Sequence, residues 1–240
     1  MNPGMADFSD GAASRARNLE GLLKLVRLIP VITIEQVDHA VPLARALVAG
    51  GLRLLEITLR TASGAAAARK IIAEVPDAIV GIGTVLSPDD LKHAVDMGAQ
   101  FALSPGATPE LLEAAAASTM PFIPGIATAS ELMQGLAFGY EIFKFFPAVP
   151  SGGIPALKAL SGPFPNVKFC PTGGITAENA SDWLALKNVA VVGGSWLTPA
   201  DALRAGNWDA ITERARHAVK TTSELTEIAE VLNGIDSSGT

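Results

Sequence analysis

The segment ARALVAGGLRLLEITL, residues 44–59, carries the pattern that decides the fold of this chain. An alanine-rich helical stretch ends at Gly50-Gly51, and a short apolar run then leads into a polar loop. Glycine is common just past the end of a helix because it adopts the left-handed conformation at little cost. The same succession returns where residues 91–97 end at Gly98 and where residues 133–138 end at Gly139. The repetition predicts helices and strands that alternate along the chain.

Apolar runs of strand length occur eight times, and most are apolar on both faces, as parallel strands covered by helices should be. Helix starts are marked by a hydroxyl residue before proline, at Ser87-Pro88 and Thr108-Pro109. Eight such units predict an α/β fold of the (β/α)8 TIM-barrel type, which typically has about 250 residues. A doubly wound open sheet is the alternative, although no G-x-G-x-x-G opens an early helix. The expected strands cover residues 29–33, 53–58, 78–82, 100–103, 121–123, 140–145, 167–170 and 189–192.

The length of 240 residues and the 49% hydrophobic content favour a single domain with a substantial core. We expect residues 1–13 to form a disordered N-terminal tail and residues 14–222 to form the barrel. A helix over about 14–27 is expected to cap the bottom of that barrel. Residues 223–240 are expected to form a C-terminal helix with a frayed end.

Composition narrows the class of function. The net charge of −6, without a Lys/Arg cluster, argues against a nucleic-acid or anionic-membrane partner. No apolar run approaches the roughly 20 residues of a membrane span, and residues 1–17 lack the apolar core of a secretory signal. The single cysteine, Cys170, fits a reducing cytoplasm and is expected to be a small buried residue at the end of a strand.

Metal binding is not expected. The three histidines, His39, His93 and His217, are far apart, and none has a second ligand at metal-like spacing. We therefore expect neither a bound metal nor a cofactor.

Lys144 is the first candidate for chemistry because it lies within the apolar run IFKFFP, residues 142–147. Burial among apolar groups disfavours the charged form of a lysine side chain. A neutral lysine amine attacks carbonyl carbons and forms a Schiff base. The alternative is a lysine on an edge strand whose ammonium group reaches solvent.

Residues at the ends of the second and third expected strands can join Lys144, since barrel active sites lie at the C-terminal ends of strands. Alternation along the second strand puts Glu56, Thr58 and Arg60 on one face if the strand stays extended. The third strand ends at Thr84. This set suits a keto acid: Arg60 would hold the carboxylate and Glu56 would move protons. A structural Glu56–Arg60 ion pair is the alternative.

The last two expected strands end in glycine pairs, Gly173-Gly174 and Gly193-Gly194, and the second pair is followed by Ser195. The loops after strands seven and eight of many barrels bind phosphate through backbone N–H groups. Two pairs at these two places indicate a phosphate site, whereas either pair alone would be an ordinary tight turn.

These motifs resemble those of the 2-dehydro-3-deoxy-6-phosphogluconate (KDPG) aldolase family, whose members often also cleave 4-hydroxy-2-oxoglutarate (KHG). The resemblance covers roughly residues 25–220. It implies a cytoplasmic, metal-independent class I aldolase of the Entner–Doudoroff pathway, on a (β/α)8 barrel and usually homotrimeric, that acts on a small 2-keto acid phosphate. The motifs are EITLRT (56–61), GIGTVL (81–86), FKFFPA (143–148), FCPTGGI (169–175) and GGSWL (193–197).

The resemblance also implies roles for individual residues. Lys144 matches the Schiff-base lysine and Glu56 the general acid/base, while Arg60 and Thr84 match the residues that hold the substrate carboxylate. Two further groups are implied: Gly173, Gly174, Gly194 and Ser195 for the phosphate, and Pro105, Phe146 and Thr172 for the pocket lining.

Two features depart from the family pattern. The N-terminal extension has no counterpart, and Val149-Pro150 stands where a glutamate is expected. Several readings stay open: an aldolase for the galactonate epimer, a phosphosugar isomerase or epimerase, a metal-dependent pyruvate aldolase, and a phosphosugar-binding barrel without catalysis.

Overall fold

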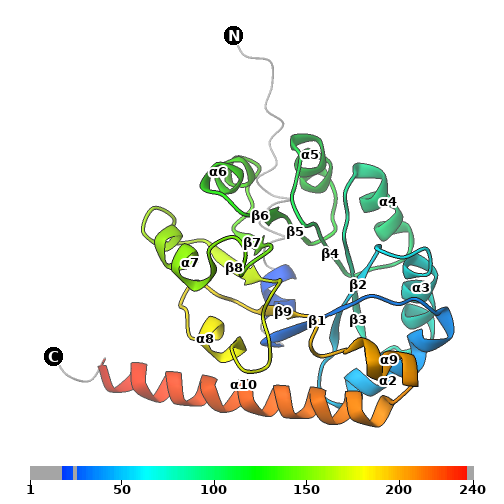
Figure 1. Cartoon of the computed structure of the whole chain (residues 1–240). Coiled ribbons are helices and arrows are strands. Elements are labelled where there is room, and N and C mark those ends of the chain that lie inside the picture. Colours follow the sequence, from blue (N-terminus) through cyan, green and yellow to red (C-terminus); the bar gives the residue numbers. More distant parts are fainter. Residues whose placement is uncertain (1–17, 24–25, 237–240) are drawn as a thin grey trace.

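The computed structural model describes residues 18–23 and 26–236 of the chain, with side chains as far as residue 222. Parallel strands line the centre of the molecule and helices lie outside them (Figure 1). The strands are β1 (Leu28–Ile32), β2 (Leu54–Thr58), β3 (Ile79–Gly83), β4 (Phe101–Leu103), β5 (Phe122–Ile123), β6 (Gly125–Ile126), β7 (Ile142–Phe145), β8 (Lys168–Pro171) and β9 (Val192–Gly194).

The helices follow the strands in alternation, as the sequence predicts. They are η1 (Val37–His39), α2 (Ala40–Ala49), α3 (Gly64–Glu74), α4 (Pro88–Asp96), α5 (Pro109–Ala117), α6 (Ala129–Ala137), α7 (Gly153–Ser161), α8 (Ala180–Leu184), α9 (Ala200–Ala205) and α10 (Trp208–Asp236). The predicted starts of α4 and α5 are confirmed, because the hydroxyls of Ser87 and Thr108 accept hydrogen bonds from backbone N–H groups in the first turn.

All strand pairs are parallel. One sheet has the order β5-β4-β3-β2-β1-β9 and curves into a half-barrel, and a second has the order β6-β7-β8. Two isolated parallel bridges, Phe169 with Val189 and Thr172 with Gly193, connect the β8 side of the second sheet to the β9 side of the first. The α/β class with parallel strands is therefore confirmed.

Each expected strand has a counterpart, but two differ in detail. The fifth is expected at residues 121–123; β5 covers Phe122–Ile123, and a further short strand, β6, follows after Pro124. The eighth is expected at residues 189–192, whereas β9 covers Val192–Gly194 and only Val189 forms a bridge before it. That prediction is wrong because it puts the two glycines beyond the end of the strand. Gly193 and Gly194 instead form ladder pairs with β1.

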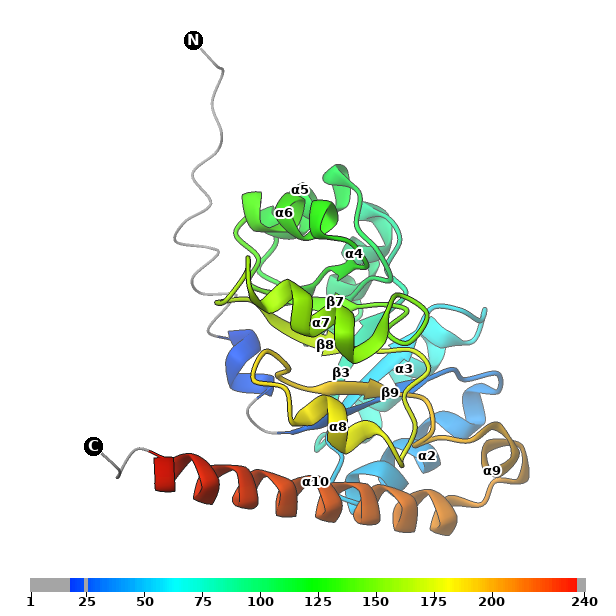
Figure 2. The same ribbon diagram turned by 60° about the vertical axis from the view of Figure 1, so that its left-hand side comes forward.

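The two ends of the chain also differ from expectation. Residues 18–23 are helical, but Val26 and Arg27 are not, and β1 begins at Leu28. The last helix begins at Trp208, well before residue 223, and runs along one side of the molecule, where it packs on α2, α8 and α9 (Figure 2). Residues 1–17, 24–25 and 237–240, which include the expected N-terminal tail and the frayed end, lie outside the described part of the chain.

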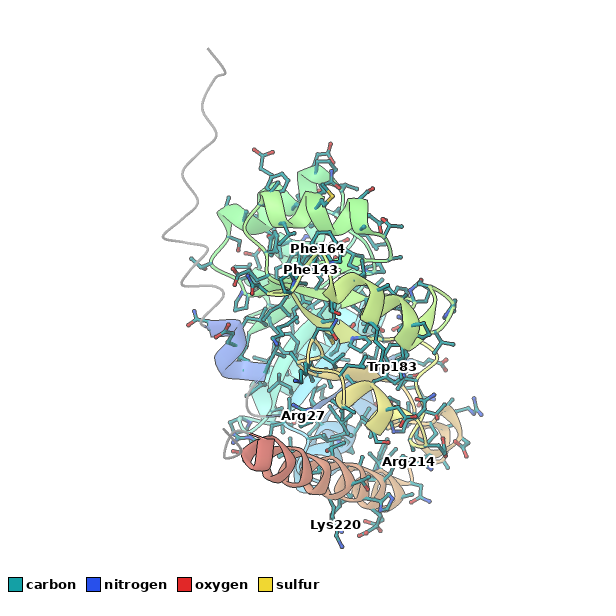
Figure 3. All side chains as sticks on the ribbon, turned by 90° about the vertical axis from the view of Figure 1, so that its left-hand side faces the viewer. Arg27, Phe143, Phe164, Trp183, Arg214 and Lys220 are labelled. Atoms are coloured by element: carbon teal, nitrogen blue, oxygen red, sulfur yellow. The ribbon has the colours of Figure 1, made fainter. Side chains whose placement is uncertain are left out.

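The core has two parts. The larger part lies between the strands and the outer helices, and Figure 3 shows two of its aromatic side chains, Phe143 of β7 and Trp183 of α8, and Phe164, which is partly buried against it. The smaller part gathers apolar side chains from most of the strands together with Leu19 and Leu23 of the N-terminal helical turns. The side chains that position the site come from the same strands as this smaller core.

Candidate active site

Lys144 and Glu56 form a buried ion pair. Lys144 Nζ lies 2.7 Å from Glu56 Oε1, and the two side chains are only 2% and 1% exposed. They come from β7 and β2, which belong to different sheets. Two charges removed from water lose several kcal/mol of hydration each, which their attraction offsets only when the geometry is good. The alternative of a lysine whose ammonium group reaches solvent is therefore wrong.

The second carboxylate oxygen of Glu56, Oε2, is buried and has no hydrogen-bond partner among the described residues. Leaving such an oxygen without a donor costs about 1–3 kcal/mol, or more when the group is charged. A substrate hydroxyl or a water at this position would supply the missing hydrogen bond. The free oxygen is thus a site where a proton could be exchanged.

Apart from Glu56, the neighbours of Lys144 in the sheet and the ring beside it are small or apolar. The Phe146 ring centroid lies 5.5 Å from Lys144 Nζ. In the sheet Lys144 is in register with Gly125 on one side and Cys170 on the other. Cys170 is fully buried in β8, as expected, and burial raises the pKa of its thiol to about 12. The thiol is therefore neutral beside the Lys144–Glu56 pair at physiological pH.

Arg60 does not lie where the extended-strand prediction puts it. Strand β2 ends at Thr58, and Leu59 and Arg60 form a turn in which Arg60 is exposed. The alternative of a Glu56–Arg60 ion pair is also wrong, because the carboxylate of Glu56 pairs with Lys144. A turn residue leaves the pleat, so the alternation of strand faces no longer governs its side chain.

Thr84 lies at the same edge of the sheet as the turn formed by Leu59 and Arg60. Thr58 and Gly83 are in register, and the Leu59 N–H donates to the Gly83 carbonyl oxygen at 2.9 Å. Thr84 follows directly with a backbone φ of +63°, and within the described residues every other positive φ belongs to a glycine. A β-branched residue in this conformation is strained by about 1–3 kcal/mol, and such strain gathers at functional sites.

The glycine segments after β8 and in β9 lie side by side. Thr172 of the first forms a parallel bridge with Gly193 of the second. The N–H groups of Gly173, Gly174 and Ser195 have no hydrogen-bond acceptor among the described residues. Backbone N–H groups of this kind are suited to binding an anion.

The remaining sequence candidates are all at least partly buried. Thr172 is buried, and Pro105 and Phe146 are half-buried. Ser195 also lines a cavity of about 160 Å³ between the loop after β1 and helix α9, which neither Lys144 nor Glu56 lines. The Lys–Glu pair and the glycine segments therefore define the candidate site better than this cavity does.

Sequence reasoning misses two neighbours of the Lys144–Glu56 pair. Gly83 lies against the Glu56 side chain, and Cys170 lies beside Lys144. Gly83 belongs to the motif GIGTVL, in which Thr84 is the candidate for function. Cys170 belongs to FCPTGGI, in which the candidates are Thr172, Gly173 and Gly174. Only the register of neighbouring strands could have revealed these contacts.

The described residues hold no group of three His, Cys, Asp or Glu side chains that could bind a metal ion. In the same part of the chain, no helix is both long enough and apolar enough to cross a membrane. The titratable pair at the centre of the site is Lys144 with Glu56.

A buried lysine paired with a carboxylate, at the ends of parallel strands, is the arrangement of an α/β enzyme that forms Schiff bases. A family model described as "KDPG and KHG aldolase" matches residues 19–214. The chain belongs to this family.

Individual relatives agree with the family model. The chain is 56% identical over 201 residues to the KHG/KDPG aldolase of Escherichia coli K12, covering 84% of this chain and 94% of that protein. It is 56% identical over 200 residues to a 2-dehydro-3-deoxy-phosphogluconate aldolase of Dickeya dadantii, covering 83% and 94%.

Solved structures are similar as well. The KDPG aldolase of Legionella pneumophila, with pyruvate captured as a covalent carbinolamine, has a TM-score of 0.82 and 50% identity over 83% of this chain and 97% of that chain. The Zymomonas mobilis ZM4 enzyme with 3-phosphoglycerate has a TM-score of 0.79 and 43% identity, covering 85% and 95%.

Proposed function

We propose that the protein is a class I aldolase that cleaves 2-dehydro-3-deoxy-6-phosphogluconate to pyruvate and glyceraldehyde 3-phosphate. It would also cleave 4-hydroxy-2-oxoglutarate to pyruvate and glyoxylate. The observation that carries this proposal is the buried contact of 2.7 Å between Lys144 Nζ and Glu56 Oε1. It joins a nucleophilic amine and a proton acceptor in a site shielded from water.

The reaction begins with proton transfer from the Lys144 ammonium to Glu56 along their hydrogen bond. The neutral amine attacks C2 of the keto acid, and the protons redistribute as water leaves. Lys144 then carries an iminium ion, and Glu56 is again a carboxylate. The positive charge has moved from the ammonium nitrogen to the iminium, so charge balances.

Cleavage follows because the iminium accepts electrons. Glu56 takes the proton of the C4 hydroxyl, the C3–C4 bond breaks, and its electron pair forms the enamine of pyruvate. The aldehyde leaves, and Glu56 returns its proton to C3. Water then hydrolyses the iminium and frees pyruvate and Lys144. The unpartnered Oε2 of Glu56 is a suitable atom for these transfers.

The two ends of the substrate would be held by the groups around this pair. Arg60 and Thr84 would bind the carboxylate next to C2, and the N–H groups of Gly173, Gly174 and the Gly194–Ser195 segment would bind the phosphate. Pro105, Phe146 and Thr172 would line the space between. Binding of the remote phosphate helps to hold the reacting carbons in register.

Several structural expectations also enter as proposals. We propose that β5 and β6 act as one interrupted strand, so that the two sheets close into one eight-stranded barrel. The isolated bridges Phe169–Val189 and Thr172–Gly193 support closure. The burial of Leu19 and Leu23 against the interior strand residues supports an N-terminal helix that caps this barrel. A closed barrel and an N-terminal capping helix are both consistent with one barrel domain over residues 14–222.

The oligomeric state and the cellular location are proposed on the basis of family membership. We propose a homotrimer in the cytoplasm, with no metal or cofactor, and no nucleic-acid or membrane partner. Sedimentation analysis of the purified protein tests the trimer, since a monomer or dimer would have a different mass.

The galactonate epimer of the substrate is the second candidate. A structure described as native KDPGal shares 28% identity and a TM-score of 0.69 with this chain. The two substrates differ at one hydroxyl. Rates of pyruvate release from both epimers decide between them.

The test of the proposed function is reduction with borohydride in the presence of pyruvate, followed by peptide mass mapping. We expect a reduced pyruvyl adduct on Lys144, formed equally well with EDTA present. An absence of adduct on any lysine would overturn the class I mechanism, and loss of activity in EDTA would favour a metal-dependent aldolase.

A further inference from the structure

The loop after β7 is joined to the glycine segment after β8 by two backbone hydrogen bonds. The Ala148 N–H donates to the Thr172 carbonyl oxygen at 2.8 Å, and the Val149 N–H donates to the Gly173 carbonyl oxygen at 3.0 Å. Because both bonds are backbone bonds, they hold residue 149 beside Gly173 and Gly174 whatever its side chain. Position 149 is therefore a fixed neighbour of these two glycines.

The side chain of Val149 packs directly on Gly174. A Cβ atom built on Gly174 would lie 2.7 Å from Val149 Cβ and 2.9 Å from Cγ2. Yet Val149 is 45% exposed, one of four exposed large apolar side chains in the described part of the chain. An apolar group that is both open to solvent and in contact with Gly174 therefore lies next to two N–H groups, of Gly173 and Gly174, that have no acceptor among the described residues.

We propose that Val149 is a specificity-determining residue that favours substrates with a phosphate at the end remote from the keto group. The backbone N–H groups of Gly173 and Gly174 carry partial positive charge. A neutral side chain at position 149 leaves that charge unopposed, whereas a charge there adds to or cancels it. This inference rests on the proposed function, because it presumes that these N–H groups receive the substrate phosphate.

The test compares substitutions of opposite charge at one position. Val149→Glu, Val149→Gln and Val149→Lys are assayed on 2-dehydro-3-deoxy-6-phosphogluconate and on the same sugar acid without phosphate. The quantity measured is the ratio of the two kcat/KM values. Val95→Glu is the matched control, since Val95 is 43% exposed and lies on α4.

We expect Val149→Glu to lower the ratio about fivefold or more relative to Val149→Gln at low ionic strength, the scale of a Coulomb interaction between a carboxylate and a phosphate dianion in water. Val149→Lys should raise the ratio, and Val95→Glu should leave it unchanged. Salt should reduce these differences, since at 1 M the screening length is about 3 Å.

Formation of the pyruvate adduct on Lys144 distinguishes a failure of this inference from a failure of the proposed function. If the parent protein forms the adduct and cleaves the phosphorylated substrate, but the Glu, Gln and Lys variants have equal ratios, the role of Val149 is overturned and the proposed function stands. If the parent protein forms no adduct, the proposed function fails and this inference fails with it.

Discussion

Gly83 of β3 lies directly against the side chain of Glu56 of β2. A Cβ atom built on Gly83 would lie 2.6 Å from Glu56 Cγ and 2.8 Å from Cδ, and it would overlap Oε1. Oε1 is the atom that contacts Lys144 Nζ. The absence of a side chain at position 83 is therefore a condition for the Lys144–Glu56 pair.

Gly83→Ala should displace the Glu56 carboxylate and break its contact with Lys144. We expect a loss of about 1–3 kcal/mol in the free energy of unfolding, as for other overpacked interiors, and at least about a tenfold fall in kcat. Chemical denaturation and steady-state kinetics measure the two effects. Gly106→Ala is the control, because a Cβ there meets nothing within 4 Å; equal behaviour of the two variants would contradict the packing argument.

Lys144→Ala should abolish turnover and leave Glu56 as an unpaired buried charge. Breaking a buried ion pair in this way costs about 3–5 kcal/mol, so the melting temperature should fall. The double variant Lys144→Met with Glu56→Gln should recover part of the stability without any activity. Wild-type turnover by Lys144→Ala would end the Schiff-base mechanism for this chain.

Glu56→Gln should retain the lysine but lose the proton acceptor. We expect the variant to be trapped by borohydride with pyruvate, more slowly than the parent, while cleavage falls by about 10² to 10⁴, the usual contribution of general acid–base catalysis. Comparison of the adduct yield with kcat separates formation of the Schiff base from cleavage of the substrate. If kcat stayed at the parent value, proton transfer would belong to another group.

Arg60→Ala should weaken binding of the substrate carboxylate. A hydrogen bond to a charged group contributes about 1.5–3 kcal/mol, so kcat/KM should fall by about 10- to 150-fold, mainly through KM. Arg53→Ala is the control, because Arg53 is an exposed arginine whose partner is Asp77. Similar kinetics for the two variants would remove Arg60 from the site.

Cys170 should make stability decline at alkaline pH. Its pKa is about 12 in the folded protein against an ordinary value of 9.0. The unfolded chain therefore loses the thiol proton first, so the stabilisation is complete below pH 9 and is lost as pH rises toward 12.

The measurement is the free energy of unfolding at several pH values for the parent and for Cys170→Ala. Between pH 9 and 11 the parent should lose stability faster than the variant, by up to about 1.4 kcal/mol per pH unit. Parallel curves would show that folding does not raise the pKa of this thiol.

The sequence alone predicted the parts of this protein that depend on neighbours along the chain. The helix starts at Ser87 and Thr108 follow from local capping, and the alternation of apolar runs with alanine-rich helices predicts parallel strands. The isolated position of Lys144 in an apolar run also marks it as a candidate without any knowledge of the fold.

Tertiary structure decided what these residues contact. Glu56 pairs with Lys144, 88 positions away, and not with Arg60, four positions away, because β2 ends at Thr58 and turns Arg60 out of the strand. In the same way Gly193 and Gly194 lie within β9, since the ladder with β1 continues through them. Helix capping and the spacing of apolar residues are set by neighbours a few positions away along the chain. The register of a strand and the place where it ends depend on which segments meet in space.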